Sequence, residues 1–456
     1  MKHRIPPSIP IAALTLCVFV LAGAAQAPQT PAPQQPSDIS TTISSSGDLG
    51  PPRLAVPAFI PLSNDADTVA AARLVSNVLW DDLNFEREFA FIPRDVLGTV
   101  PTPKSLDDVP FDRWRELNAD GVVAGTVQKS GPGFLVRVRV FDVKSRRQAF
   151  GQEYSGSTNA RAYAHAISDE IFKTQRGLRG VARTRLTFQS DRDGERMAGT
   201  IENRNVKEVY FSDYDGENQR RVTSNRSLNG FPAWSPDARS IAYMSWRRGQ
   251  PQIFVSHIFE GTLDEVTKMP GENWTPAWSP DGTRIAFASS RDGNSEIYVA
   301  NRDGSNVRRI TNNPAIDISP TWSPNGTEIA FTSDRSGSPQ IYTVSADGLG
   351  AVQRLTSESY CDRPTWSPAP FNEIAFASRT GGGFDIKVIE VSSRTVRQLT
   401  FGEGVNESPS FAPNGRHIAF TSTRAGKSQI FIMARDGKDV KQLTKAGNNK
   451  QPSWSN

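Results

Sequence analysis

Cysteine and histidine are nearly absent from this chain. Its 456 residues include only two cysteines and four histidines. Cys17 lies in an N-terminal segment that we expect to be removed, so Cys361 would be left alone and no disulfide could form within the mature chain. The remaining histidines, His165, His257 and His417, are far apart in the sequence. We therefore expect neither a histidine-based metal site nor a Ser-His-Asp triad.

Long hydrophobic runs are also scarce. One apolar run, residues 11–22, follows a basic start and precedes small residues, which is the pattern of a cleaved secretory signal peptide. We predict a signal over residues 1–24, with cleavage possible as late as residue 27. The run is short for a membrane span, and no other run approaches that length. The sequence therefore predicts a protein exported across the inner membrane, with no direct membrane insertion.

No large excess of either charge is present. The chain has 52 basic and 48 acidic residues, and the basic count becomes 50 once Lys2 and Arg4 leave with the signal. A nearly neutral chain without a basic run is a poor ligand for phosphate backbones. We expect no nucleic acid partner.

Recognisable catalytic motifs are missing as well. The chain has no Gly-x-Ser-x-Gly elbow, no phosphate-binding loop and no paired cysteine motif. Its repeated Asp-Gly pairs are each isolated at a position where a turn is needed, so we interpret them as turns rather than calcium loops. The sequence predicts no enzyme, no catalytic or metal-binding residue and no cofactor.

What the chain does have is a repeat of Trp-Ser-Pro or a close variant. The repeated aromatic residues are separated by 44, 44, 44, 45 and 43 residues, and they are Trp234, Trp278, Trp322, Trp366, Phe411 and Trp454. A period of this length with several short strand signals is typical of a propeller blade of four antiparallel strands. We expect the repeated aromatic side chains to be core.

Turn and polar signals recur inside each unit. Asp281-Gly282 predicts a two-residue hairpin, because both residues tolerate positive φ. A Ser-x-Arg pattern, as in Ser289 and Arg291, recurs after the second strand. We interpret it as hydrogen bonding between blades, since a feature shared by the blades rarely marks one unique site.

The ends of the repeat region predict how the ring closes. Five full units follow the first five aromatic residues, whereas Trp454 ends the chain with no hairpin after it. Residues 186–192 reproduce the second-strand pattern with no tryptophan before them. The sequence therefore predicts a mainly β protein whose residues 180–456 form a six-bladed β-propeller, closed by the C-terminal strand.

The region before the repeats has two parts. Residues 25–50 form a proline- and glutamine-rich arm, which we expect to be flexible. A weak strand signal in it contains Ile39, Thr41 and Ile43, and this segment is either more linker or a partner-binding strand. Residues 51–178 alternate between strand and helix patterns, which predicts a small α/β domain.

Taken together, these features resemble the TolB family of periplasmic propeller proteins. The resemblance rests on the export signal, the small α/β domain, the Trp-Ser-Pro-Asp-Gly blades, the junction over residues 180–185 and the first-blade run over residues 212–219. It implies a non-enzymatic, monomeric scaffold of the Tol-Pal system. Such a scaffold binds the lipoprotein Pal across one mouth of the propeller channel and communicates with TolA of the inner membrane through its mature N-terminus. The implied roles are outer-membrane integrity, protein transport and envelope constriction during cell division.

One departure and two other functions remain open. Here the strand-forming segment lies behind a proline-rich tether rather than at the mature end, so its role towards TolA is open. An unrelated exported protein-binding propeller is the first alternative. A propeller peptidase or lyase is the other, but it would need a hydrolase domain or a histidine cluster that the sequence does not show.

We expect the partner at the mouth where the innermost strands begin. In each unit the residues just before the Pro-x-Trp strand vary while the strands repeat, as expected of a surface that reads one partner. These candidate residues are Leu228, Asn229, Glu272, Asn273, Asp317, Ile318, Tyr360, Cys361, Asp362, Asn406, Glu407, Asn449 and Lys450.

Overall fold

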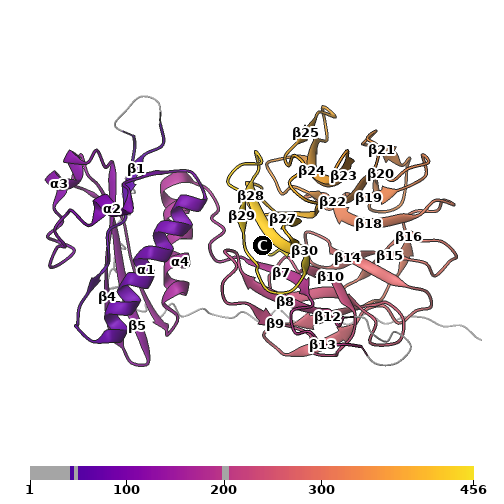
Figure 1. Ribbon diagram of the computed structural model, residues 1–456, viewed down its shortest axis with the longest axis horizontal. Coiled ribbons are helices and arrows are strands. Elements are labelled where there is room, and N and C mark those ends of the chain that lie inside the picture. The colour runs from indigo at the N-terminus through magenta and orange to yellow at the C-terminus, as the bar shows by residue number, and fades with distance from the viewer. Residues whose placement is uncertain (1–41, 46–49, 198–204) are drawn as a thin grey trace, which may run out of the picture. The chain divides into compact units, whose positions relative to one another are not determined.

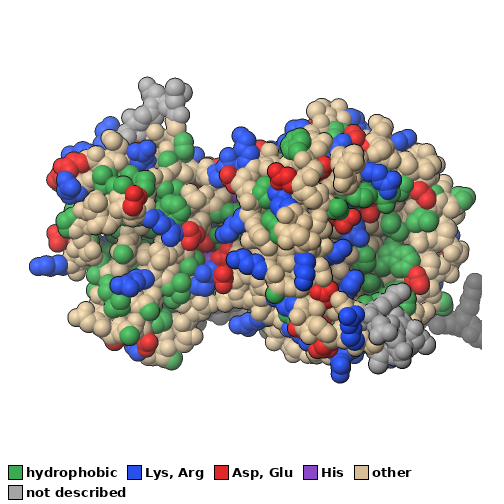
Figure 2. Space-filling model, viewed as in Figure 1, with side chains coloured by type: hydrophobic (Ala, Val, Ile, Leu, Met, Phe, Trp, Pro, Cys, Tyr) green, Lys and Arg blue, Asp and Glu red, His purple; other side chains and the backbone are tan. Residues whose placement is uncertain are grey.

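The computed structural model describes residues 42–45, 50–197 and 205–456. The predicted signal peptide and most of the arm, including Ile39 and Thr41, lie outside these residues. Within the described ranges, no helix has both the length and the apolar character that crossing a membrane requires. Basic and acidic side chains are interspersed on the face shown in Figure 2.

The N-terminal part is an α/β domain built on one mixed sheet (Figure 1), as predicted. The sheet order is β3-β1-β4-β5-β6, with β2 paired to β4. Strand β1 runs parallel to β3 and β4, whereas β4, β5 and β6 are antiparallel. The elements are β1 (Arg53–Ala55), β2 (Ile60–Pro61), α1 (Ala66–Phe85), β3 (Ala90–Phe91), α2 (Arg94–Leu97), α3 (Phe111–Glu116), β4 (Gly121–Ser130), β5 (Gly133–Asp142), β6 (Gln148–Ser157) and α4 (Ala160–Arg176).

Local sequence explains the two long helices. Asp65 caps α1 by accepting a hydrogen bond of 3.0 Å from the backbone N–H of Thr68. Helix α4 ends at Gly177, whose φ of +64° is the left-handed conformation that favours glycine. The apolar faces of the two helices are buried with one face of the sheet, through residues such as Leu79 and Phe172.

Among the described residues from 185 to 454, the strands form six four-stranded antiparallel sheets (Figure 1), which are the blades of the predicted propeller. Blades 1 to 5 are continuous in sequence, and a closing blade combines β30 with β7, β8 and β9. The closing blade contains β30 (Asn449–Trp454), β7 (Arg185–Ser190), β8 (Glu208–Asp213) and β9 (Arg220–Arg221). Blade 1 contains β10 (Asn229–Trp234), β11 (Ser240–Ser245), β12 (Gln252–His257) and β13 (Thr262–Glu265), and blade 2 contains β14 (Asn273–Trp278), β15 (Arg284–Ser289), β16 (Glu296–Asn301) and β17 (Arg308–Arg309). Blade 3 contains β18 (Asp317–Trp322), β19 (Glu328–Ser333), β20 (Gln340–Ser345) and β21 (Gln353–Arg354); blade 4 contains β22 (Cys361–Trp366), β23 (Glu373–Thr380), β24 (Gly383–Glu390) and β25 (Val396–Gln398); and blade 5 contains β26 (Asn406–Phe411), β27 (His417–Ala425), β28 (Lys427–Ala434) and β29 (Lys441–Gln442).

The repeated tryptophans join neighbouring blades, which confirms their assignment to the core. Trp322 of blade 3 is 5% exposed and packs in one cluster with Ala286 and Ile297 of blade 2. Its indole Nε1 donates a hydrogen bond of 3.0 Å to the backbone oxygen of Ala277. Such contacts tie one blade to the one before it, and each of the six seams between blades holds its own cluster of buried hydrophobic side chains.

The Asp-Gly turns are longer than the sequence predicted. The connection from β14 to β15 contains five residues, because β14 ends at Trp278 and β15 begins at Arg284. Asp281 accepts a hydrogen bond of 3.0 Å from the Thr283 N–H, and Gly282 has a φ of +69°. The two-residue hairpin was therefore wrong, although the aspartate and the glycine are both used by the turn.

The residues of the Ser-x-Arg pattern form hydrogen bonds within a blade rather than between blades. In blade 3, Arg335 Nε donates to Ser333 Oγ at 2.9 Å and Nη2 donates to Asp317 Oδ2 at 2.8 Å. All three residues belong to that blade. The interpretation of this pattern as blade-to-blade bonding was wrong, because the arginine links the second strand to the innermost strand of its own sheet.

The closing blade joins the two ends of the propeller sequence. Strand β30 pairs antiparallel with β7, with Asn449 opposite Ser190 and Trp454 opposite Leu186. The Ser455 N–H donates to the Arg185 oxygen at 2.8 Å. Because this pairing gives the innermost strand of the closing blade a partner, it removes two unpaired edges from the ring.

The α/β domain also makes buried contacts with the connector and with blade 5. Glu86, at the end of α1, accepts hydrogen bonds from the Val181 N–H at 3.0 Å and from Asn414 Nδ2 at 3.1 Å. Burial raises the pKa of Glu86 to about 8. Next to it, the His417 ring stacks on Phe85 with 4.0 Å between ring centroids. A carboxyl group held in this way anchors the connector between the two domains.

Removing the last strand should destabilise the propeller far more than its length suggests. We expect Trp454→Ala alone to cost about 3–5 kcal/mol, because a buried aromatic ring leaves a cavity at the closure. Deletion of residues 451–456 should cost at least as much, measured by thermal and urea unfolding. Asn456→Ala is the control, since Asn456 is exposed. A truncated protein that melts like the full chain would contradict the role of β30 in closure.

Candidate functional site: the propeller channel

The channel is lined by the six innermost strands, β10, β14, β18, β22, β26 and β30. These strands occupy equivalent positions in their sheets and all begin at one end of the channel. We call the end where they begin mouth A and the end where they finish mouth B. The sequence prediction concerned mouth A.

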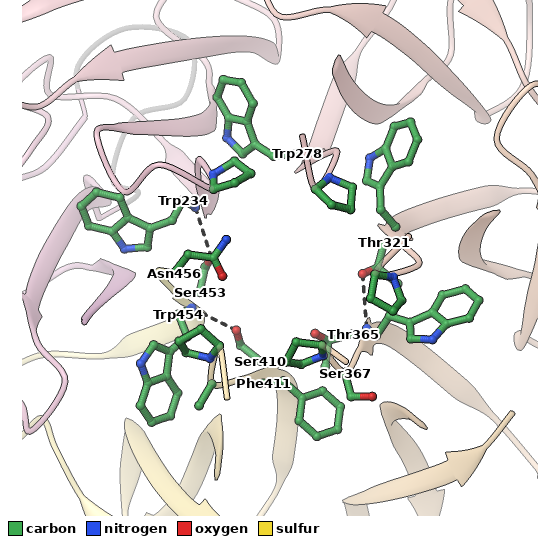
Figure 3. A pocket seen from close by; sticks show the side chains of 18 of the residues that line it. Trp234, Trp278, Thr321, Thr365, Ser367, Ser410, Phe411, Ser453, Trp454 and Asn456 are labelled. Atoms are coloured by element: carbon green, nitrogen blue, oxygen red, sulfur yellow. Dashed lines mark hydrogen bonds between the residues drawn. The ribbon is translucent and has the colours of Figure 1, made fainter. Parts of the chain in front are cut away.

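Mouth B opens into a cavity of about 730 Å³ lined by prolines and by the ends of the innermost strands. Figure 3 shows the labelled tryptophan rings pointing away from the opening. Serine and threonine hydroxyls join adjacent strands here; for example, Ser410 Oγ accepts from the Trp454 N–H at 3.0 Å. Gly177, Leu178 and Arg179 of the connector between the domains also line this cavity. Mouth B is therefore partly occupied by the chain itself.

Just inside mouth A, each innermost strand carries a β-bulge. The pairing register with the second strand shifts once in every blade, as between Gly230 and Ala233. The residue at the bulge has positive φ although it is never glycine, which costs roughly 1–2 kcal/mol for each residue. Strain of this kind persists where the surrounding structure imposes it, and it is commonest at functional sites. The bulge residues are Phe231, Thr275, Ser319, Arg363, Ser408 and Gln451, with φ between 51° and 58°.

One bulge residue crosses the channel. Arg363 comes from blade 4 and Phe231 from blade 1, so they start from opposite sides of the six-membered ring. The guanidinium carbon of Arg363 lies 5.3 Å from the Phe231 ring centroid, and Nη1 donates to Ser408 Oγ at 2.7 Å. The cavity at this level measures only about 140 Å³. Arg363 thus places a cation at the base of mouth A.

The structure separates the predicted mouth residues into two groups. The first residue of each innermost strand is at most 1% exposed, so it is not available to a partner. These buried residues are Asn229, Asn273, Asp317, Cys361, Asn406 and Asn449. The other predicted residues are exposed or half-buried around mouth A: Leu228, Glu272, Ile318, Tyr360, Asp362, Glu407 and Lys450.

Sequence reasoning missed the bulge residues themselves. Each of them directly precedes the proline of a Pro-x-Trp unit, and this was the signal that could have found them. A strand residue before proline was expected to continue an ordinary extended strand. Its positive φ depends on pairing with the second strand, which local sequence does not specify.

Two of the three described histidines are in unexpected polar contacts. Ser240 Oγ lies 2.8 Å from His257 Nδ1, and His257 Nε2 lies 2.9 Å from Asp264 Oδ2. A serine, a histidine and an aspartate therefore meet in this blade, which the wide spacing of the histidines in the sequence did not suggest. Ser240 is only 2% exposed, however, so its hydroxyl is closed to a substrate. The contact links the neighbouring strands β11, β12 and β13.

His165 makes the second of these contacts: its Nδ1 lies 2.8 Å from Asp82 Oδ2, and the Tyr214 hydroxyl donates to the other oxygen of the same buried carboxyl group. Over the described residues, no group of three or more His, Cys, Asp or Glu side chains is placed to hold a metal ion.

Burial raises the pKa of the Cys361 thiol to about 11, which leaves it a poor nucleophile at neutral pH.

The described end of the arm is docked in the α/β domain. Ile43 is 1% exposed and belongs to the same core as Leu54. Its N–H donates to Gln175 Oε1 at 3.0 Å. Gly121 makes room for it, since a Cβ at that position would lie 2.6 Å from Ile43 Cδ1. Ile43 is thus a core residue here.

These features define a two-domain β-propeller protein whose channel carries non-repeating side chains at one mouth. Family models match both domains: the TolB amino-terminal domain over residues 43–149 and the TolB beta propeller domain over residues 172–456. The chain belongs to the TolB family.

Individual relatives agree with this assignment. The chain is 36% identical over 210 residues to the Tol-Pal system protein TolB of Desulfosudis oleivorans, covering 45% of each chain. It is also 36% identical over 218 residues to that of Alkalilimnicola ehrlichii, covering 47% of this chain and 48% of the relative. The chain thus matches about half the length of these curated relatives. The crystal structure of TolB from Acinetobacter baumannii superposes with a TM-score of 0.75 and 28% identity, covering 90% of this chain and 97% of that one.

Docking of Ile43 predicts that the arm contributes to stability only through its last residues. We expect Ile43→Ala to cost about 2–5 kcal/mol, because a fully buried side chain leaves a cavity. Thr42→Ala is the matched control, since Thr42 is exposed. Urea unfolding of the two variants gives the comparison. Equal midpoints would show that Ile43 is not part of the core in solution.

Proposed function

We propose that this protein is a non-enzymatic periplasmic scaffold of the Tol-Pal system. In this proposal mouth A of the propeller binds a Pal-like lipoprotein, and the N-terminal arm links the complex to a TolA-like protein of the inner membrane. The connection would support outer-membrane integrity and envelope constriction during cell division. Membership of the TolB family and the names of its relatives are the basis for the choice of partners.

The observation that carries the proposal is the ring of strained, non-repeating side chains at mouth A. A frame that repeats from blade to blade offers no unique feature, so a single partner must be recognised by residues that break the repeat. Phe231 and Arg363 do so within the channel, and Glu272 and Glu407 do so at its rim. Mouth B, which the connector partly fills, supports this role less well.

A binding role also fits the polar chemistry of the described residues. The serine of the Ser-His-Asp contact is buried, and the one described cysteine has a raised thiol pKa. An exported propeller with an unrelated protein partner is the second candidate. Recovery of proteins bound to a tagged form in a periplasmic extract distinguishes the two, because the first candidate requires Pal.

Reversing the acidic charges at the rim of mouth A should weaken the complex with Pal. We expect Glu272→Lys combined with Glu407→Lys to cost about 1–2 kcal/mol of binding free energy, mainly through slower association, because exposed rim charges act at long range. Titration calorimetry and stopped-flow mixing with the purified periplasmic domain of Pal measure both effects.

The matched control is Glu217→Lys, an exposed acid in the turn between β8 and β9, away from the starts of the innermost strands. It should leave affinity unchanged. If the double variant binds as wild type does while Pal still binds, the site lies elsewhere on the molecule. If wild type does not bind Pal at all, the proposed function is wrong.

Deleting residues 25–41 should separate the roles of the two partners. We expect folding and Pal binding to be unchanged, because this segment precedes the docked Ile43 and its proline- and glutamine-rich sequence is poor in residues that form a core. Binding to the periplasmic part of TolA should be reduced. A replacement of equal length with a glycine-serine sequence controls for chain length. Equal recovery of TolA by all three forms would leave the segment as a linker only.

A further inference from the structure

Every seam between neighbouring blades contains the same kind of buried polar group. A threonine after the fourth strand of one blade donates to a Glu, Gln or Asp near the start of its third strand, as Thr267 donates to Gln252 at 2.6 Å. In four seams, an asparagine that begins the next innermost strand donates to that same side chain. These asparagine contacts are Asn229 to Glu208 at 3.0 Å, Asn273 to Gln252 at 2.9 Å, Asn406 to Asp385 at 3.1 Å and Asn449 to Gln429 at 2.8 Å.

Asparagine suits this position because it both donates and accepts. Asn406 shows both functions: its Nδ2 donates across the seam to Asp385, and its Oδ1 accepts from Arg424 Nη2 at 3.2 Å. The amide therefore connects an acceptor on one side with a cation on the other.

The seam between blades 2 and 3 departs from this arrangement. Asp317 occupies the asparagine position, and the residue across the seam is Glu296. Both carboxylates are 0% exposed. Asp317 Oδ2 accepts from Arg335 Nη2 at 2.8 Å, as an asparagine oxygen would. Asp317 Oδ1, the atom in place of the asparagine NH₂, is buried with no hydrogen-bond partner.

Glu296 offers no donor to fill this gap. It accepts from Thr311 Oγ1 at 2.5 Å, from Arg309 Nη2 at 2.7 Å and from the Asn313 N–H at 2.6 Å. Arg309 and Arg335 balance the two acidic charges, but neither is hydrogen-bonded to Asp317 Oδ1. The remaining ionisable groups nearby, Asp292 and the Tyr298 hydroxyl that donates to it, lie beside Arg309.

We propose that Asp317 and Glu296 share one proton at neutral pH, so that a carboxylic O–H replaces the asparagine N–H of the other seams. A carboxyl group can donate only when it is protonated. Two facing carboxylates in a dry seam favour one neutral partner, because ionising both adds like-charge repulsion to the cost of burial. In agreement, burial raises the pKa of Asp317, and it outweighs the opposing effects of Arg335 and of the nearby Ser333 and Thr311 hydroxyls.

The shared proton makes the seam sensitive to alkaline conditions. Loss of the proton leaves two buried acceptors facing each other, which favours separation of blades 2 and 3. Asp317 directly precedes Ile318 at mouth A, so the separation would deform the surface proposed for Pal. This last step rests on the proposed function, whereas the proton itself does not.

The first test is the stability of Asp317→Asn as a function of pH. The native state of wild type keeps the proton to higher pH than the unfolded chain, so wild-type stability falls as pH rises above the ordinary aspartate pKa. The variant supplies a permanent donor. We expect its melting temperature to exceed that of wild type by about 2–4 °C at about pH 8 and by much less at about pH 4. A pH-independent difference would overturn the proposal.

Two further variants keep the test decisive. Glu296→Gln removes the other carboxylate and should abolish the same pH dependence, even if it also lowers stability overall. Asn406→Asp places an acid opposite Asp385 with Arg424 beside it, and so it copies the arrangement of the seam between blades 2 and 3. It should introduce a second loss of stability on raising pH. If Asn406→Asp is destabilising equally at all pH values, the shared-proton explanation is wrong.

Infrared difference spectroscopy reports the proton directly. Wild type at neutral pH should show one C=O stretch of a protonated carboxyl group that Asp317→Asn lacks, in addition to any band that Glu86 contributes to both proteins. Absence of this band from wild type would overturn the proposal. The proposal would also be overturned if a metal chelator lowered the melting temperature of wild type but not that of Asp317→Asn. Such a result would mean that a bound cation, rather than a proton, lies beside Asp317 Oδ1.

Pal binding tests the consequence for mouth A. Wild-type affinity for the periplasmic domain of Pal should fall severalfold between about pH 6 and about pH 8.5, while that of Asp317→Asn should change less. If both affinities change equally, the proton does not regulate the mouth. If Pal fails to bind either protein but the stability results hold, the proposed function is wrong and the shared proton stands.

Discussion

Pairing of the last strand with the first strand of the propeller sequence is the constraint on which the rest of the molecule depends. Strand β30 aligns with β7 although Asn449 and Ser190 lie far apart in the chain. Each blade buries its aromatic residue against the blade before it, so an open ring would expose a core surface at both ends. The channel and its two mouths exist only once this contact forms.

Within the closed ring, the repeated residues form a framework that is the same in every blade, and the residues that depart from the repeat make individual blades different. Six bulges direct one residue from each blade towards the channel, and six seams bury a polar group between blades. Most of these positions carry interchangeable residues such as threonine, serine and asparagine. Arg363, Phe231 and Asp317 differ, and they place a cation, an aromatic ring and a buried acid at or below one mouth. Because fold alone does not define function, these exceptions are the informative residues.

Much of this could be read from the sequence, because it depends on local period and turn chemistry. The regular spacing of Trp-Ser-Pro predicted the blades, and the unmatched ends predicted a split blade. Patterns in residues 51–178 predicted the α/β domain. The mouth was predicted only in part: Glu272 and Glu407 lie at its surface, whereas Asn273 and Asn406 next to them are buried in the seams. Neighbouring residues of an innermost strand face different surroundings, and the repeat does not reveal which one faces the solvent.

The sequence by itself determined the number of blades, the strand order within each and the residues of the core, since these follow from hydrophobic pattern over a few dozen residues. Tertiary structure alone decided which side chains meet across long separations. Arg363 reaches Phe231 across the channel, Asn273 donates to Gln252 across a seam, Ser240 meets His257 and Asp264 across strands, and Ile43 enters the α/β core. Such contacts depend on strand register and on closure of the ring, which arise from the summed packing of all blades and leave no signal in any one segment.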